Sequence, residues 1–251
     1  MEKTLKERCE EYRSKTDYRV SKENYILVML DGRSFSRVIK NNFELPFDDT
    51  FIGLMNDTAA YVAKNVQGVK FAYTQSDEIS LLITAFGERE DLFFSGRLVK
   101  MLSIIPGLAT AYFNKHLPAD FPLVEFDAKV WEVPTQNDAF AWFLYRQNDC
   151  IRNSKLQHAQ HYFSHNALKG LGQDEQVEKV LKEKGVDWNT AYDDGKKYGR
   201  LILKGEELYE GPQGEYYRTV WKVKNASPLM TIKDEMLALI PEKNEDKRTD
   251  N

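Results

Sequence analysis

The sequence contains little cysteine, no long apolar run and no excess of basic residues. Only Cys9 and Cys150 occur, which are too few for a disulfide framework and lack the spacing of a structural zinc site. No stretch reaches the roughly 18 consecutive apolar residues that suggest a membrane-spanning helix, and the first residues lack the apolar core of a secretory signal. These absences predict a cytoplasmic protein with free thiols and no membrane partner.

The net charge of -4 argues against a protein that binds nucleic acid through bulk charge, so any RNA contact requires a local basic face. The sequence also has no internal repeat and no low-complexity tract. Hydrophobic residues make up 42% of the 251 residues, which is enough to bury a sizeable core. We therefore expect one large domain, or a domain with an appendage.

Hydrophobic periodicity predicts an α+β fold in the first half of the chain. Strands are expected at 25–33, 69–74, 79–84 and 126–133, helices at 48–65 and 96–115, and a loop at 32–47. The resulting β-α-β-β-α-β order is the split βαβ pattern, an antiparallel sheet with helices on one face. A charged helix at 4–16 is expected to cover an edge of the core.

The second half of the chain has a different pattern. One long helix is expected at 135–165, a shorter one at 173–184 that ends at Gly185, and a β-hairpin around Gly211–Gly214. We therefore predict a catalytic sheet domain at 1–134, a helical and hairpin extension packed on it at 135–240, and a flexible tail at 241–251.

Acidic residues occur where two central strands of this topology meet. The first and third strands are antiparallel neighbours, so Asp31 at the end of one lies beside Asp77 and Glu78 at the start of the other. Two carboxylates from separate strands suit a pair of Mg²⁺ ions, which can activate an attacking oxygen and stabilise a leaving one in phosphoryl or nucleotidyl transfer. The alternative interpretation is a capping aspartate and a solvated hairpin turn.

Two further segments have features of phosphate sites. Gly32 permits close approach of the backbone to a ligand, and the amides of Arg33 to Ser36 could surround a triphosphate. Arg97 and Lys100, near the start of a helix, could hold a second phosphate group. They could equally be solvated surface charges.

The long helix has a polar face that includes Arg146, Asp149 and Asn153. This face is either the solvent side of the helix or a binding surface, and the neighbouring Arg152, Lys155 and Lys169 favour RNA or phosphate. The same helix carries three histidines on one face, His158, His161 and His165. Without a carboxylate or cysteine in that pattern, ordinary surface histidines are favoured over a zinc site.

Several segments together make the sequence similar to the tRNA-histidine guanylyltransferase family, and more closely to its bacterial and archaeal guanylyltransferase-like branch. They are Asp31-Gly32-Arg33-Ser34-Phe35, Asn42-Phe43-Glu44 with Pro46 and Asp48, Tyr73-Thr74-Gln75-Ser76-Asp77-Glu78, Phe126-Asp127-Ala128-Lys129-Val130 and Tyr145-Arg146-Gln147-Asn148-Asp149-Cys150. The resemblance covers roughly residues 25–198. It implies a domain like the palm of forward polymerases that adds nucleotides to a tRNA 5′ end in the 3′-to-5′ direction.

The resemblance also implies roles for individual residues. Asp31, the Gly32 carbonyl and Asp77 would hold two Mg²⁺ ions, with Glu78 in support. The implied nucleotide contacts are Arg33, Ser34, Phe35, Ser36, Asp48 and Ser76, and Arg97 and Lys100 would bind triphosphate when the 5′ end is activated with ATP or GTP. The expected RNA contacts are Arg146, Arg152, Asn153, Lys155 and Asn189. A homotetramer is also implied.

One departure from the family separates its branches. Eukaryotic members continue after the cysteine with His-Ile-Asn-Asn, whereas this chain has Ile151-Arg152-Asn153-Ser154. The change favours a template-dependent enzyme that repairs 5′-truncated tRNA over one that adds an untemplated guanylate to tRNA-histidine. A palm-type nucleotidyl cyclase with the same metal pair and a non-catalytic RNA-binding sheet are the alternatives.

Overall fold

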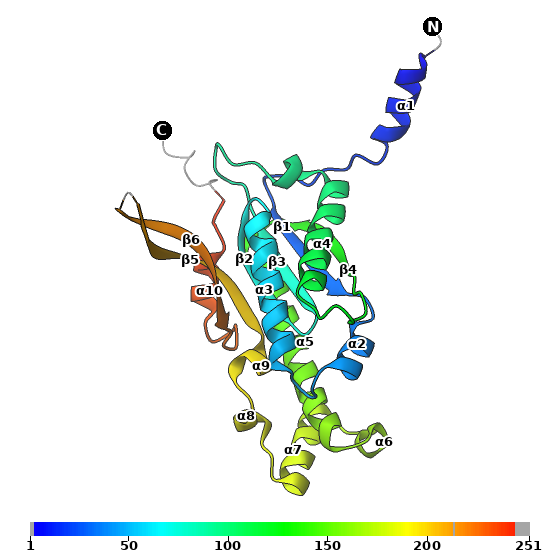
Figure 1. Ribbon diagram of the computed structural model, residues 1–251, viewed down its shortest axis with the longest axis vertical. Helices are drawn as coiled ribbons and strands as arrows, with labels where there is room; N and C mark the ends of the chain where they lie inside the picture. Colours follow the sequence, from blue (N-terminus) through cyan, green and yellow to red (C-terminus); the bar gives the residue numbers. More distant parts are fainter. Residues whose placement is uncertain (1–2, 213, 244–251) are drawn as a thin grey trace.

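A six-stranded antiparallel sheet forms the centre of the molecule (Figure 1), in a computed structural model that describes residues 3–212 and 214–243. The strands are β1 (Tyr25–Gly32), β2 (Val69–Gln75), β3 (Glu78–Ile83), β4 (Phe126–Val133), β5 (Arg200–Gly211) and β6 (Gly214–Asn225). They lie in the order β4-β1-β3-β2-β5-β6. The order of the first four confirms the predicted α+β fold and the antiparallel pairing of β1 with β3.

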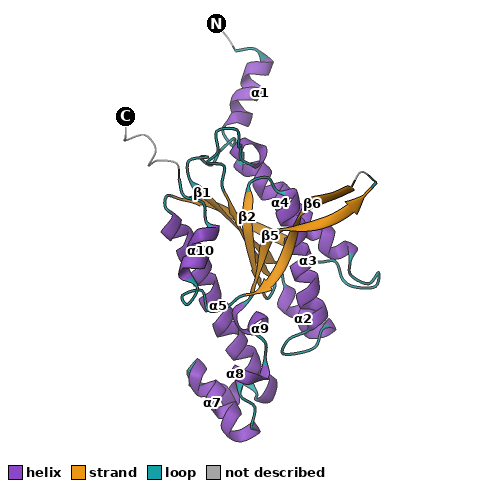
Figure 2. Cartoon of the chain, turned by 90° about the vertical axis from the view of Figure 1, so that its left-hand side faces the viewer, coloured by secondary structure: helices purple, strands orange, loops and turns teal. Residues whose placement is uncertain are grey.

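Helices cover both faces of this sheet (Figure 2). On one face lie α3 (Asp49–Asn65) and α4 (Leu98–Lys115), and on the other lie α5 (Gln136–Tyr162) and α10 (Lys233–Leu239). The remaining helices are α1 (Leu5–Ser14), α2 (Phe35–Asn42), the 3-10 turn η1 (Phe93–Gly96), α6 (His165–Leu168), α7 (Gln173–Lys184), α8 (Trp188–Ala191) and α9 (Asp194–Tyr198).

Strand β1 is apolar almost throughout because both of its faces are covered. Ile26, Val28 and Leu30 pack into the core beneath α3 and α4, whereas Tyr25 and Leu27 pack into the core beneath α5 and α10. Side chains alternate between the two faces of a strand, so a strand between two helical layers needs apolar residues at every position.

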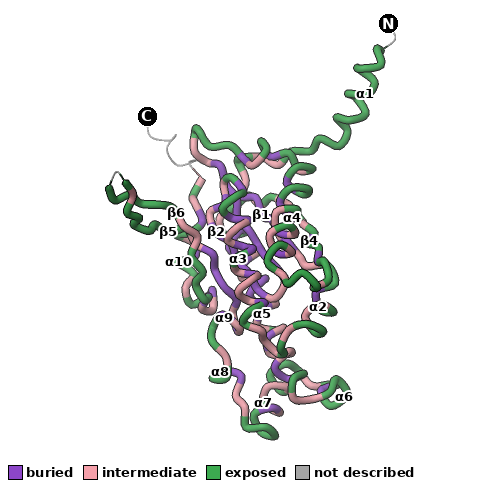
Figure 3. Tube along the Cα trace, viewed as in Figure 1, coloured by how far each residue is buried: buried purple, intermediate pink, exposed green. Residues whose placement is uncertain are grey.

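Helix α1 contradicts the prediction that it covers the core. None of its residues is buried, and it projects from the body of the molecule, as the tube coloured by burial shows (Figure 3). Its apolar stripe consists only of Leu5, Cys9 and Tyr12, of which Leu5 is 71% and Tyr12 67% exposed. The helix is closed locally by a capping box between Thr4 and Glu7.

Helix α2 lies within the segment that was expected to be a loop. Phe35, Val38 and Ile39 recur at helical spacing and pack into the core, with Phe35 fully buried. The turn-forming residues Asn42 and Pro46 obscure this short pattern in the sequence. Asn42 is the last residue of the helix, and Pro46 lies in the segment that leads into α3.

The extension completes the sheet. Strand β5 pairs with β2, with Phe71 opposite Leu203, and β5 and β6 form the predicted hairpin around Gly211 and Gly214. Helices α6 to α9 lie beside the second half of α5 (Figure 1). The domain division at residue 134 stays a prediction, and the predicted tail lies outside the described residues from 244 onward. Among the described helices, none has the length and apolar character needed to cross a membrane.

Candidate active site

Four acidic residues lie at one edge of the sheet. Asp31 of β1 is paired with Glu78 of β3 on one side and with Asp127 of β4 on the other. Asp77 lies in the two-residue turn before Glu78, and its carbonyl accepts a hydrogen bond of 3.2 Å from the Gly32 amide. The structure therefore brings Asp31, Asp77 and Glu78 together as the topology predicts. Sequence reasoning misses Asp127, although it lies in one of the segments that carry the family resemblance.

The turn between β2 and β3 holds Asp77 through an unusual backbone conformation. Ser76 has a φ of 47°, in the left-handed region that residues with a Cβ seldom adopt. Its hydroxyl donates a 2.9 Å hydrogen bond to Oδ1 of Asp77. Residues held in such conformations are often found at functional sites, where the surrounding structure fixes them.

Burial raises the pKa of each of the three predicted acids. For Asp31, repulsion from Asp127 raises the pKa further, and the charge of Asp31 adds to the increase for Asp77. For Glu78, burial is opposed by hydrogen bonds from Arg146, which favour the ionised carboxylate. A cluster of partly buried like charges is unfavourable unless a cation or a proton joins it. Carboxylates with raised pKa values of this kind are typical of functional sites.

These shifts predict a gain in stability when one acid is neutralised. The folded-state pKa of Asp31 lies above its unfolded value, so the folded protein holds a proton there that the unfolded chain has lost. The free energy of unfolding therefore falls as pH rises from the unfolded to the folded pKa. We expect Asp31→Asn to raise the melting temperature in the presence of EDTA, and to raise it more at neutral than at acidic pH. Thermal unfolding of both proteins across that range tests this. An asparagine variant that is less stable at every pH would contradict it.

Arg146 of α5 forms an ion pair with Glu78 of β3. Its Nε and Nη2 each donate a 2.7 Å hydrogen bond to the two Glu78 oxygens, and its Nη1 donates one of 2.7 Å to Asp149. Both partners of the pair are buried, with side-chain exposures of 11% and 6%. Arg146, an expected RNA contact, therefore has its guanidinium engaged by two carboxylates, and its contact with RNA stays a prediction.

The start of α2 lies beside the acids. Ser34 is left-handed, with a φ of 59°, and makes no side-chain cap, so the first amides of the helix are not bonded to that side chain. The Phe35 side chain lies in the core, so only its backbone is available for the predicted nucleotide contact. A Cβ on Gly32 would overlap the Phe35 ring, which explains the glycine. Arg33 is exposed and pairs with Glu125 at 2.9 Å.

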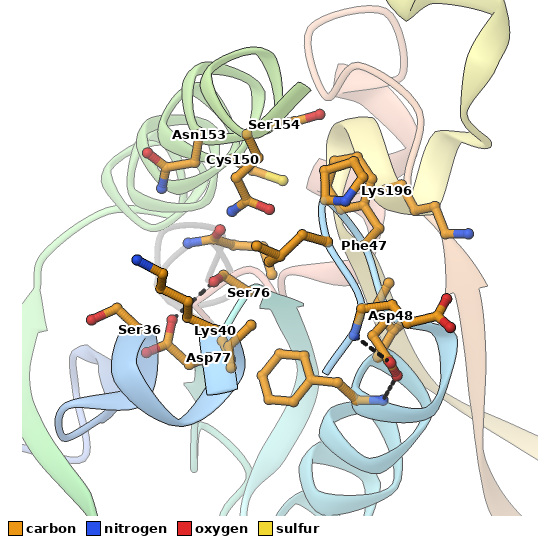
Figure 4. Close-up of a pocket in the computed structure, with 18 of the residues that line it drawn as sticks. Ser36, Lys40, Phe47, Asp48, Ser76, Asp77, Cys150, Asn153, Ser154 and Lys196 are labelled. Atoms are coloured by element: carbon orange, nitrogen blue, oxygen red, sulfur yellow. Dashed lines mark hydrogen bonds between the residues drawn. The ribbon is translucent and has the colours of Figure 1, made fainter. Parts of the chain in front are cut away.

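A cavity of about 310 Å³ opens on the Asp77 side of this edge (Figure 4). Ser36, Lys40, Ser76 and Asp77 lie on one side of it, and Phe47 and Lys196 lie on the other. Its lining is completed mainly by apolar side chains of the segment before α3 and of the first turn of α3, and by polar side chains of α5, including Leu45, Phe51, Ile52, Asn153 and Gln157. An apolar pocket with a few polar groups beside perturbed acids is a candidate ligand site.

One residue that was predicted to contact the nucleotide has a structural role in the cavity, and two lining residues were not predicted. Asp48 lines it, but its carboxylate accepts hydrogen bonds from the amides of Phe51 at 2.8 Å and Glu44 at 3.0 Å, so it shapes the wall and caps α3. Sequence reasoning misses Lys40 and Lys196. The only available signal for Lys40 is its position one turn after Ser36 in a helix that the sequence does not reveal.

Arg97 and Lys100 are not part of this cavity. They lie at the start of α4, whereas Thr110, thirteen residues later, is bonded to the Phe126 amide beside the acidic edge. At a rise of 1.5 Å per residue, this separation is roughly 20 Å. Arg97 donates a 2.8 Å hydrogen bond to Asp17. The binding of triphosphate by Arg97 and Lys100 stays a prediction, and it concerns a site apart from the cavity.

The other expected RNA contacts occupy two places. Asn153 lines the cavity, and Arg152 is half-exposed and pairs with Asp149 at 2.9 Å. Lys155 pairs with Asp174 of α7 at 2.6 Å, and the Asn189 side chain bonds to Asp187 at the start of α8. The last two residues therefore belong to the region around α7 and α8, beyond the acids.

The prediction of ordinary surface histidines is wrong for His158. It is fully buried, and its Nδ1 lies 2.9 Å from the Tyr192 hydroxyl, because α7 to α9 fold back against this part of α5. His165 lies beyond the end of α5, in α6. Within the part of the chain that the structure describes, no group of three or more His, Cys, Asp or Glu side chains is arranged to hold a metal ion, and this applies to the acidic edge as well as to the three histidines.

Comparison with known proteins agrees with the sequence resemblance. The family described as tRNAHis guanylyltransferase matches residues 6–137, which is more than half of the chain. A relative named tRNA(His) guanylyltransferase from Neurospora crassa is 29% identical over 206 residues, which cover 74% of this chain and 68% of the relative.

Solved structures match over nearly the whole length. A bacterial tRNA(His) guanylyltransferase (Thg1)-like protein in complex with ATP aligns with a TM-score of 0.84 and 28% identity, over 95% of this chain and 99% of that one. A structure of such a bacterial protein in complex with GTP aligns with a TM-score of 0.79 and 26% identity, with the same coverage. The match extends through the helical and hairpin extension.

Proposed function

The chain belongs to the tRNA(His) guanylyltransferase family and is a nucleotidyltransferase, and on this premise we propose that it repairs 5′-truncated tRNA by template-dependent nucleotide addition in the 3′-to-5′ direction. The observation that carries the proposal is the position of Asp77, which lines the cavity and neighbours Asp31 at the sheet edge. A nucleotide in this cavity would present its phosphates to the acids. The replacement of the eukaryotic histidine by Ile151 supports the repair branch.

The acids fit the divalent cations that the family resemblance implies. We assign the ligands as the Asp31 and Asp77 carboxylates and the Gly32 carbonyl, because Mg²⁺ commonly uses one or two carboxylates and keeps several waters. Burial raises the pKa of both carboxylates, and a bound cation would favour their ionised forms and lower both pKa values. When bound, two such ions stabilise the attacking and leaving oxygens. Glu78, held by Arg146, is the supporting carboxylate rather than a free ligand.

The other residues position the nucleotide and the RNA end. The amides at the start of α2, with Ser36 and Ser76, face the phosphates, and Phe47 and the other apolar side chains enclose the base. In the family reaction the RNA 5′-monophosphate is first nucleotidylated by a nucleoside triphosphate, with release of pyrophosphate. The 3′-hydroxyl of the incoming nucleotide then attacks the 5′-phosphorus of the activated end, forms a phosphodiester bond and releases the activating nucleoside monophosphate. The resemblance extends the proposal to Arg97 and Lys100 as triphosphate contacts and to a homotetramer.

We expect Lys40 to contact the nucleotide phosphates. Lys40 lines the cavity between Ser36 and Asp77 (Figure 4), so Lys40→Ala should raise the KM for the nucleotide about tenfold, as for the loss of one hydrogen bond to a charged group. The KM for RNA should change little. Lys64→Ala, an exposed residue in the last turn of α3, is the matched control. An unchanged nucleotide KM in the Lys40 variant would remove this residue from the site.

The proposal is tested by incubating the protein with a 5′-truncated, 5′-phosphorylated tRNA, Mg²⁺, ATP and all four nucleotides, followed by sizing of the RNA on a gel. Growth at the 5′ end that stops at the full acceptor stem is the expected result. Turnover of a nucleotide to a cyclic product without RNA would support the cyclase instead. Intact RNA binding with neither product would leave an RNA-binding protein.

A further inference from the structure

Outside the cavity, whose lining includes none of its residues, a partly exposed aromatic surface lies between α5 and β4. We call it the α5–β4 shelf, and it consists of Lys129, Trp131, Trp142, Tyr145 and Arg152. The ring of Trp131 contacts that of Trp142 at a centroid distance of 4.5 Å, and Trp142 contacts Tyr145 at 5.7 Å. The first two rings are partly buried, whereas Tyr145 is 55% exposed.

The shelf leads directly to the acids. Arg146 places its guanidinium over the rings of both Tyr145 and Trp142, at 5.0 and 5.5 Å, while it binds Glu78. On β4, Lys129 and Asp127 occupy the same face as Trp131, because alternate residues of a strand share a face. A molecule lying on Tyr145 would therefore be separated from the acidic edge only by Arg146.

The charges of the shelf suit an RNA strand. Lys129 lies on the edge strand β4, and Arg152 is 53% exposed in its side chain. Lys129 is on the strand, and Arg152 is on the same helix as Tyr145, seven residues later. Stacking of bases on aromatic rings, beside cations that contact phosphates, is a common way in which proteins bind RNA bases.

We propose that the α5–β4 shelf binds the 5′-terminal nucleotide of the RNA, with its base stacked on Tyr145. This inference rests on the proposed function. The cavity then holds the incoming nucleotide on the Asp77 side of the acids, and the RNA end reaches them from the Asp127 side. The shelf thereby explains an exposed aromatic residue that neither core contributes to and that the predicted site did not include.

The test uses the full chain and a 5′-phosphorylated acceptor-stem RNA that carries 2-aminopurine as its 5′-terminal base. Stacking quenches this fluorophore, so we expect quenching with the wild type and with Tyr145→Phe, and none with Tyr145→Ala. In the extension assay, Tyr145→Ala should raise the KM for RNA about tenfold and leave the KM for the nucleotide unchanged. Tyr18→Ala, which removes a tyrosine that is 67% exposed outside the shelf, is the control.

The outcomes separate this proposal from the proposed function. If the wild type extends RNA but Tyr145→Ala changes neither the quenching nor the KM for RNA, only the proposal that the shelf binds the RNA end would be overturned. Tyr145-dependent quenching without extension would support the shelf and contradict the polymerase. A Tyr145→Ala variant that changes only the oligomeric state would identify the surface as a contact between copies and also overturn the shelf.

Discussion

Replacement of Asp77 by asparagine is expected to lower the rate of nucleotide addition by about a thousandfold or more. Metal ions contribute several kcal/mol of transition-state stabilisation in such reactions, and each 1.36 kcal/mol corresponds to about tenfold in rate. Asp77 lines the cavity, and its carbonyl is bonded to the amide of Gly32, the residue after Asp31, so its replacement removes one of the proposed metal ligands. Single-turnover measurements with saturating RNA isolate this step from binding.

Two observations separate a catalytic loss from a folding defect in this variant. The burial that raises the pKa of Asp77 means that asparagine should leave the cation-free protein at least as stable as the wild type. RNA binding should also persist. Asp57→Asn, an exposed aspartate on α3, provides a matched control that should retain full activity. Full activity of Asp77→Asn would show that the site is elsewhere.

Loss of Arg146 is expected to destabilise the fold more than any other single charge change at the site. Arg146→Gln leaves Glu78 buried without its cationic partner, and breaking such a pair typically costs about 3–5 kcal/mol. Nucleotide addition should fall as well, because the bidentate hydrogen bonds fix the Glu78 carboxylate beside Asp31. Urea unfolding and single-turnover rates measure the two effects.

A double-mutant cycle isolates the pair. Glu78→Gln combined with Arg146→Gln should recover much of the stability lost by Arg146→Gln alone, because no unpaired charge is then buried. Arg152→Gln is the matched control, since its pair with Asp149 is half-exposed and such pairs contribute at most about 1 kcal/mol. If Arg146→Gln lowered the free energy of unfolding by less than Arg152→Gln does, the stabilising role of the buried pair would be contradicted.

The acidic edge could be predicted because short-range patterns determine it. The apolar run that ends at Asp31 and the turn at Ser76-Asp77 are local features, and the split βαβ order then fixes which strand ends meet. The same reasoning predicted the helix at 48–65, which the structure has as α3 with Asp48 as its N-cap. These features depend on periodicity and on element order, both of which the sequence contains.

The remaining features depend on contacts between distant parts of the chain. Arg146 looks like a solvated or RNA-binding cation until the fold places it against Glu78, 68 residues away. His158 likewise becomes buried only because α7 to α9 return to α5. The far wall of the cavity includes Lys196, which follows the near wall by more than a hundred residues. No local pattern in the sequence specifies these pairings.

The most direct measurement of the proposed function is the identity of the nucleotide that the protein adds. In a 5′-truncated tRNA, the nucleotide opposite the vacant position is changed to each of the four bases, and the added 5′ nucleotide is determined for each RNA. Template-dependent repair predicts that the added nucleotide is the Watson–Crick complement in every case. Addition of guanylate regardless of the opposing base would contradict the proposal and indicate untemplated guanylyl transfer.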